Sequence, residues 1–233
     1  MASTLDTLEI LYEDNHVIVV NKKAGDLVQN DKTGDRSLRE LVMQYIKDKY
    51  NKPGNVYLGV VHRLDRPTTG AVLFAKTSKA LTRLNATFKA KEAKKTYWAI
   101  VNGKTRANNG TLKHFMVRNR KQNKSTAHKK PVPDAKEAVL HYKVLKVFDK
   151  YTLLEINLET GRHHQIRAQM KAIGHYIKGD LKYGSPRSNA DAGIHLHARR
   201  LQVKHPVKDT VLDITAPVPD DVLWQLAVIK NKL

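Results

Sequence analysis

Residues 139–158 read VLHYKVLKVFDKYTLLEINL, two apolar stretches separated only by Asp149 and Lys150. Val, Ile, Leu and aromatic residues dominate both stretches and are typical of β-strands, and two residues are enough for the loop of a β-hairpin. The sequence therefore predicts an antiparallel pair of strands over residues 139–148 and 151–158.

Further strands and helices are predicted on both sides of this hairpin. Ser37 and Glu40 have the spacing of a capping box, and apolar residues follow at helical spacing, which predicts a helix over 37–50. Helices interspersed with strands and a hairpin predict an α+β fold, with a mixed, mainly antiparallel, bent sheet and flanking helices. The other predicted strands are 17–20, 56–61, 71–75, 96–101, 194–203 and 211–214, and the other predicted helices are 78–88, 162–173 and 219–229.

Length and composition narrow the class of protein. The chain has 233 residues and no cysteine, so it has no disulfide, no cysteine zinc site and no cysteine nucleophile. Without an internal repeat or a Gly/Ser-rich linker, residues 1–233 are expected to form a single domain. Residues 1–10 lack a signal-peptide apolar run, and no window approaches the roughly 18 apolar residues of a membrane span. We therefore expect a cytoplasmic protein.

Positive charge is concentrated in one stretch of the chain. The net charge is +20, and residues 76–130 contain 16 basic residues and 1 acidic residue. A cationic stretch of this kind is typical of nucleic-acid binding, although basic residues can also only be solvated. Residues 118–133 show no apolar period and are expected to form a mobile basic loop. The residues expected to contact an RNA backbone are Lys121, Lys124, Lys129 and Lys130.

Residues 62–70 read HRLDRPTTG and lie between two predicted strands. Pro67 and Gly70 interrupt regular structure, so a side chain can be presented at the edge of the sheet. Arg63 and Arg66 flank Asp65 and favour its ionised form. By itself this pattern can indicate a nucleophile or an anchor, but it is more typical of a loop Asp that pairs with Arg and caps a turn.

Two more clusters, ETGRHHQIR at 159–167 and IHLHAR at 194–199, complete a pattern that resembles the RluA-type pseudouridine synthases. That family's nucleophile motif is His-Arg-Leu-Asp-x-x-Thr-Ser-Gly, and Thr69 replaces its Ser here. Residues 161–167 match Gly-Arg-x-His-Gln-Ile-Arg, and residues 196–198 match Leu-His-Ala. A further match is Lys95, Tyr97 and Ala99, and residues 17–27 resemble the opening strand and turn, with Lys23 where Pro is usual.

The resemblance implies isomerisation of a uridine within RNA without a cofactor or metal: the glycosidic bond breaks, the uracil turns, and its carbon 5 joins the ribose. It assigns Asp65 as the nucleophile, and attack on the sugar, attack on the base and charge stabilisation all stay open. Tyr97 matches the residue that stacks on the base and takes the carbon-5 proton, Arg167 matches the partner of the catalytic carboxylate, and Leu196 matches a residue packed against the base.

Physical chemistry agrees with these implied roles. A stacked base hides its glycosidic bond, so it must be flipped out, and the ring of Tyr97 offers a face to receive it. Arg167 can hold a carboxylate with two hydrogen bonds. Without the motifs, Tyr97 fits an ordinary strand residue and Arg167 a helix-surface cation. The expected substrate-binding residues are His62, Arg63, Arg66, Thr69, Arg162, His163, Gln165, Leu196 and His197.

Three other functions fit parts of the sequence. The histidines at 62, 163, 164, 195 and 197 resemble metal ligands, but neighbouring Arg residues would repel a cation. A glycosidase needs two facing carboxylates, and only Glu159 could join Asp65. A non-catalytic RNA-binding protein with this fold would lose Asp65, Tyr97 or Arg167. We expect a monomeric enzyme without a metal that acts on structured ribosomal or transfer RNA, and that lacks the RNA-binding domain that precedes the catalytic domain in many relatives.

Overall fold

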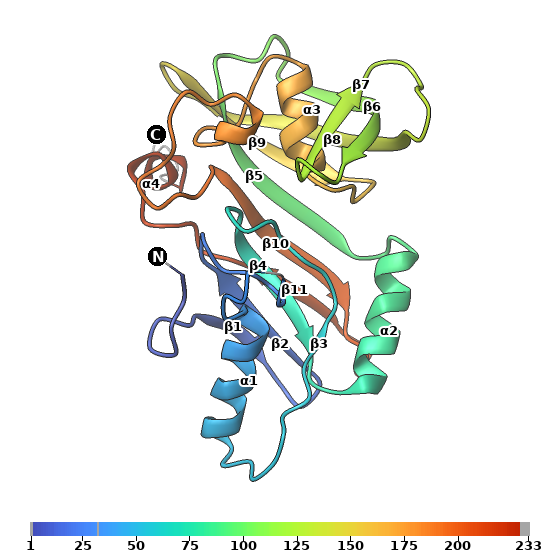
Figure 1. Ribbon diagram of the computed structural model, residues 1–233, viewed down its shortest axis with the longest axis vertical. Coiled ribbons are helices and arrows are strands. Elements are labelled where there is room, and N and C mark those ends of the chain that lie inside the picture. The colour runs from blue at the N-terminus through green and yellow to red at the C-terminus, as the bar shows by residue number, and fades with distance from the viewer. Residues whose placement is uncertain (1, 32, 229–233) are drawn as a thin grey trace. The chain divides into compact units, whose positions relative to one another are not determined.

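The computed structural model describes residues 2–31 and 33–228 (Figure 1). These residues form two compact units. The first unit contains residues 2–94, apart from 32, and residues 198–219. The second unit contains residues 95–197 and 220–228. That both units form a single catalytic domain stays a prediction.

The first unit contains a sheet in the order β1-β2-β4-β10, with β3 paired to β4 and β11 paired to β10. Strand β2 pairs antiparallel with β1 and β4, so that Val17 lies opposite Ala75. Apolar residues dominate β2 and β4, and every residue of β4 is buried, as expected for central strands. The strands are β1 (Ile10–Glu13), β2 (Val17–Lys22), β3 (Gly59–Val60), β4 (Thr69–Ala75), β10 (Leu196–Lys204, of which residues 198–204 belong to this unit) and β11 (Val211–Thr215).

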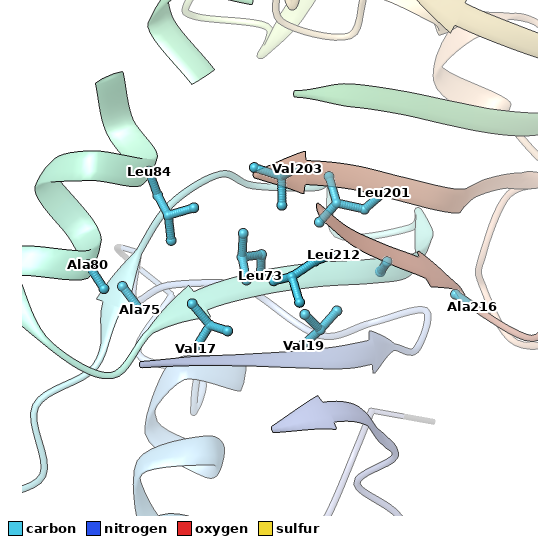
Figure 2. Close-up of a cluster of buried hydrophobic side chains, with 11 residues drawn as sticks. Val17, Val19, Leu73, Ala75, Ala80, Leu84, Leu201, Val203, Leu212 and Ala216 are labelled. Carbon is cyan, nitrogen blue, oxygen red and sulfur yellow. The ribbon is translucent and has the colours of Figure 1, made fainter. Parts of the chain in front are cut away.

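Two helices flank the sheet of the first unit, α1 (Leu38–Lys49) and α2 (Ser78–Lys89). Ser37 and Glu40 form the predicted capping box, whereas α2 is capped by Thr77, one residue before the predicted Ser78. Figure 2 shows Ala80 and Leu84 of α2 in one cluster with residues of β2, β4, β10 and β11. This core fixes the strand that follows residues 62–68.

The second unit is an antiparallel sheet in the order β5-β9-β8-β6-β7. The predicted hairpin is confirmed: the Phe148 N–H donates to the Tyr151 carbonyl at 2.8 Å. The strands are β5 (Lys94–Asn102), β6 (Asn109–Asn119), β7 (Lys124–His128), β8 (Lys136–Val147) and β9 (Tyr151–Leu158). The helices are α3 (Gln165–Ala172), the 3-10 helix η1 (Leu181–Tyr183) and α4 (Val222–Val228).

The predicted α+β fold, with a mixed, mainly antiparallel sheet and flanking helices, is confirmed, and the differences are local. The segment 118–133 is not irregular throughout, because β7 pairs with β6 through backbone groups, which need no apolar period. Its mobility stays a prediction. His164 has a φ of 53°, so α3 begins at Gln165, three residues after the predicted start. Of the predicted strand 56–61, only Gly59–Val60 forms, and Ile229, the predicted end of α4, lies outside the described residues.

Among the residues described, every helix is too short or too polar to cross a membrane.

Candidate active site

Asp65 lies in a turn of the first unit, between β3 and β4. The Thr68 N–H donates to the Asp65 carbonyl at 3.0 Å and closes this turn, and the Gly25 N–H donates to the Arg66 carbonyl at 3.0 Å. Gly70 follows with a φ of 113°, and a Cβ there would lie 2.4 Å from the Ala198 carbonyl oxygen. Glycine is therefore needed where the chain leaves the turn.

The side chain of Lys22 holds the Asp65 turn from inside the protein. Its ammonium donates to the carbonyls of Lys23 at 3.0 Å, Arg66 at 2.9 Å and Thr68 at 2.8 Å. The residue is 1% exposed, and burial lowers the pKa of Lys22 to about 7, while the charges of Asp26 and Asp65 oppose this decrease. Three acceptors use all three N–H groups of the ammonium, so the protonated form fits this geometry best.

Lys22→Met is expected to lower turnover about tenfold or more, because the Arg66 and Thr68 carbonyls of the Asp65 turn lose a charged donor, and such a hydrogen bond contributes about 1.5–3 kcal/mol. The matched control is Lys23→Met at the neighbouring position, which is expected to keep wild-type turnover. Tritium release from carbon 5 of uridine in RNA measures turnover, and thermal unfolding tests the fold. Near wild-type turnover in Lys22→Met would contradict the role of this lysine.

The other predicted residues near Asp65 make contacts within the protein. His62 Nε2 accepts a hydrogen bond from the Leu73 N–H at 3.1 Å, and its ring stacks on Phe88 at 5.2 Å between centroids. Arg66 donates to the Gly25 carbonyl at 3.1 Å and pairs with Asp35 at 2.8 Å. Arg63 is exposed and Thr69 is buried in β4. Substrate contacts of these four residues stay predictions.

Tyr97 and Arg167 lie in the second unit. Tyr97 is opposite Ile156 in the β5·β9 ladder and is 8% exposed. Arg167 lies in the first turn of α3 and is buried with Asp180, to which its Nε and Nη2 donate at 2.7 and 2.8 Å. The pairing of Arg167 with Asp65 stays a prediction.

Gln165 and Arg162 brace the loop before α3. The Gln165 side-chain oxygen accepts from the Arg162 N–H at 2.9 Å and from the Thr160 hydroxyl at 2.8 Å. Its amide nitrogen donates to the Val139 carbonyl at 3.1 Å, and Arg162 Nε donates to the Glu137 carbonyl at 3.0 Å. Through these contacts both residues hold the loop before α3 in place. Their contact with substrate stays a prediction.

His163 connects the same loop to the hairpin of β6 and β7, residues 109–128. Its Nδ1 lies 2.8 Å from the Ser125 hydroxyl, and its Nε2 lies 3.0 Å from Asn123 Oδ1. The ammonium of Lys124 is 5.5 Å from the centroid of the Tyr183 ring. Lys121 is exposed in the turn of this hairpin, and Lys129 and Lys130 are exposed just after β7. The four predicted backbone-contact residues therefore lie in or beside one hairpin.

His195 and His197 pack against Trp224 of α4. His195 Nε2 bonds to Asp221 Oδ1 at 2.9 Å, and the His195 ring stacks on Trp224 at 5.2 Å. His197 is fully buried, with its ring 5.9 Å from Trp224, and Leu196 between them is buried. Within the described part of the chain, no group of three His, Cys, Asp or Glu side chains could hold a metal ion. Asp221 is a partner that the sequence analysis did not anticipate.

Acidification is expected to destabilise the second unit through His195. Burial lowers the pKa of His195 from its ordinary 6.5, although the hydrogen bond to Asp221 opposes this change. Below about pH 6.5 the unfolded chain therefore protonates His195 more readily than the folded chain does. The contribution of neutral His195 to the free energy of unfolding is fully present above that pH and decreases as the pH falls. Burial acts to raise the pKa of Asp221, but its hydrogen bonds outweigh this effect and lower it, so its contribution is lost only at more acidic pH. Thermal unfolding between about pH 5 and 8 measures the slope. His195→Gln should flatten this slope, and an unchanged slope would contradict the assignment.

Comparisons with known proteins agree with this fold and these motifs. The family model described as RNA pseudouridylate synthase matches residues 16–172. The chain is 38% identical over 230 residues to an uncharacterized RNA pseudouridine synthase of Synechocystis, covering 97% of this chain and 70% of that one. It is 37% identical over 240 residues to the ribosomal large subunit pseudouridine synthase D of Pseudomonas aeruginosa, covering 96% and 72%.

A solved structure shows the same fold. The human RNA pseudouridylate synthase domain containing 4 has a TM-score of 0.79 and 24% identity, covering 94% of this chain and 91% of that chain. Fold and family together define an isomerase that acts on RNA. The chain belongs to the RluA-type family of RNA pseudouridine synthases.

Proposed function

We propose that this synthase converts a specific uridine of structured ribosomal RNA to pseudouridine, with Asp65 as the nucleophile on a flipped-out uridine. The observation that carries the proposal is the turn at Asp65, which the buried ammonium of Lys22 holds through the Arg66 and Thr68 carbonyls. The Pseudomonas relative is named for the large ribosomal subunit, which favours ribosomal over transfer RNA as the substrate. The enzyme is a cytoplasmic monomer with a single catalytic domain.

The proposed reaction needs no metal or cofactor. The bond between ribose and nitrogen 1 of uracil breaks, the base turns, and a bond forms between ribose and carbon 5. Carbon 5 then loses its proton, and nitrogen 1 takes up a proton, so that the product is an isomer of uridine. Tyr97 receives the base and takes that proton, and Arg167 aims the carboxylate of Asp65. The fixed guanidinium of Arg167 supports this role, because Asp180 holds it with two hydrogen bonds.

Pseudouridine mapping of total RNA tests the proposed substrate. A strain without the gene is compared with the same strain complemented by the wild-type gene or by Asp65→Asn. The expected result is a pseudouridine in ribosomal RNA that only the wild-type gene restores. A site that disappears from transfer RNA instead would contradict the choice of substrate and leave the enzyme class unchanged.

The four lysines in or beside the β6–β7 hairpin are expected to strengthen RNA binding without selecting a sequence. Changing Lys121, Lys124, Lys129 and Lys130 together to Gln should weaken RNA binding and reduce its log–log salt slope by about 0.7 to 0.9 for each phosphate that the protein no longer neutralises. The modified uridine should stay the same, because phosphate contacts carry no sequence information.

Four exposed lysines outside the hairpin give the matched control: Lys47, Lys52, Lys79 and Lys171. Changing them to Gln removes the same charge and should leave the salt slope closer to wild type. Binding is measured at several salt concentrations. An unchanged slope in the hairpin variant means that the hairpin does not contact RNA, and a changed modification site would show that it reads more than phosphate.

A further inference from the structure

Tyr183 is buried at a junction of three elements of the second unit. It is 1% exposed, and its hydroxyl accepts a hydrogen bond from the Ser125 N–H of β7 at 2.8 Å. The same hydroxyl bonds to Nδ1 of His164 at 3.0 Å, directly before α3. One oxygen atom therefore joins the hairpin strand β7 to the residue from which α3 starts.

The ring of Tyr183 faces the guanidinium of Arg167. The distance from the Arg167 Cζ to the ring centroid is 5.0 Å, within the range of a cation–π contact. Such contacts are strongest when water is excluded, and Arg167 and Tyr183 are both buried. The ring therefore contacts the same guanidinium to which Asp180 is hydrogen-bonded.

The turn that carries Tyr183 is itself closed by backbone hydrogen bonds. The N–H groups of Tyr183 and Ser185 both donate to the Asp180 carbonyl at 3.0 Å. The Gly179 N–H donates to the Ser185 hydroxyl at 3.1 Å. Asp180 and Tyr183 thus reach Arg167 from one short, well-bonded turn, and a shift of this turn would move both of its contacts together.

We propose that Tyr183 is a positioning residue for the isomerisation: its ring orients Arg167, and its hydroxyl fixes the β6–β7 hairpin to the start of α3. The inference rests on the proposed function, in which Arg167 aims Asp65 and the hairpin lysines contact RNA. A single buried side chain then links the segment that contacts RNA to the cation of the active site.

Two substitutions separate the contribution of the Tyr183 hydroxyl from that of its ring. Tyr183→Phe removes the hydroxyl and keeps the ring, so the KM for RNA should rise a few-fold while kcat stays near wild type. Tyr183→Leu removes the ring as well, so kcat should fall about tenfold or more. Tyr176, a half-buried tyrosine of the same unit, supplies the matched Phe and Leu controls, which should change neither constant.

A double-mutant cycle with Arg167→Lys tests whether Tyr183 acts through Arg167. If it does, Tyr183→Leu should lower kcat much less in the Arg167→Lys background than in the wild type. Fully additive effects, or an unchanged kcat in Tyr183→Leu, would overturn the role of the ring. An unchanged KM in Tyr183→Phe, which keeps the shape of the core, would overturn the role of the hydroxyl even if Tyr183→Leu does not fold.

All variants are assayed on whichever RNA the wild-type enzyme modifies. If the proposed RNA is wrong, the wild-type enzyme itself will modify a different RNA. If the proposed role of Tyr183 is wrong, only the kinetics of the Tyr183 variants will differ from the expected result.

Discussion

Asp65→Asn is expected to abolish turnover while RNA affinity stays within a few-fold of wild type. The amide is neutral and a poor nucleophile, so the reaction loses either the attacking group or the charge that stabilises the transition state. The fold of the turn should survive, because Asp65 closes it through its backbone carbonyl, which accepts the Thr68 N–H at 3.0 Å. Affinity should persist because a carboxylate does not attract phosphate.

Tritium release from carbon 5 of labelled uridine measures turnover for this variant, and filter binding measures its affinity. Asp48→Asn, at an exposed position of α1, is the control for the removal of one negative charge and should keep full turnover. Appreciable residual turnover in Asp65→Asn would remove Asp65 as the nucleophile.

Arg167→Lys is expected to lower turnover about a hundredfold, with a smaller effect on RNA affinity. A lysine ammonium keeps the charge, but it cannot bind both oxygens of Asp180 with a planar pair of donors or reproduce the contact of the guanidinium with the Tyr183 ring. The substitution removes the hydrogen bonds at 2.7 and 2.8 Å and the cation–π contact of the guanidinium with the ring at 5.0 Å. A small misplacement of a group that aims a nucleophile can lower the rate about a hundredfold.

Arg200→Lys is the matched control for this substitution. Arg200 also binds an aspartate, Asp213, with two nitrogens, but this pair is exposed between β10 and β11. Exposed pairs contribute little, so Arg200→Lys should keep turnover and stability close to wild type. Single-turnover kinetics measure the chemical step, and thermal unfolding measures stability. Near wild-type turnover in Arg167→Lys would remove Arg167 from the active site.

Much of the fold could be predicted because local signals agree with tertiary packing. The hairpin loop at Asp149 and Lys150 and the capping box at Ser37 depend on neighbouring residues, and both are present in the structure. Strands β6 and β7 could not be found in this way. Polar side chains dominate both strands, so the sequence shows no clear apolar alternation. The strands pair through their backbone groups.

The motifs indicated Asp65, Tyr97 and Arg167, but not the residues that hold them. Lys22 precedes Asp65 in the chain with a helix and a strand between them, and it is the first of two adjacent lysines after an apolar stretch. Asp180 and Tyr183 follow α3 in a short turn without periodicity. Such partners are defined by contacts across the fold, so spacing along the sequence carries little signal for them.

The burial of Lys22 makes its amine a chemical reporter on the Asp65 turn. An amine-specific reagent reaches this nitrogen only when the three carbonyl contacts open, since the residue is 1% exposed. Mass spectrometry can compare the labelling rate at Lys22 with that at the exposed Lys52. This comparison would therefore measure how fast the turn opens in the intact enzyme. Slower labelling in the presence of RNA would show that the turn at Asp65 opens less often when RNA is bound.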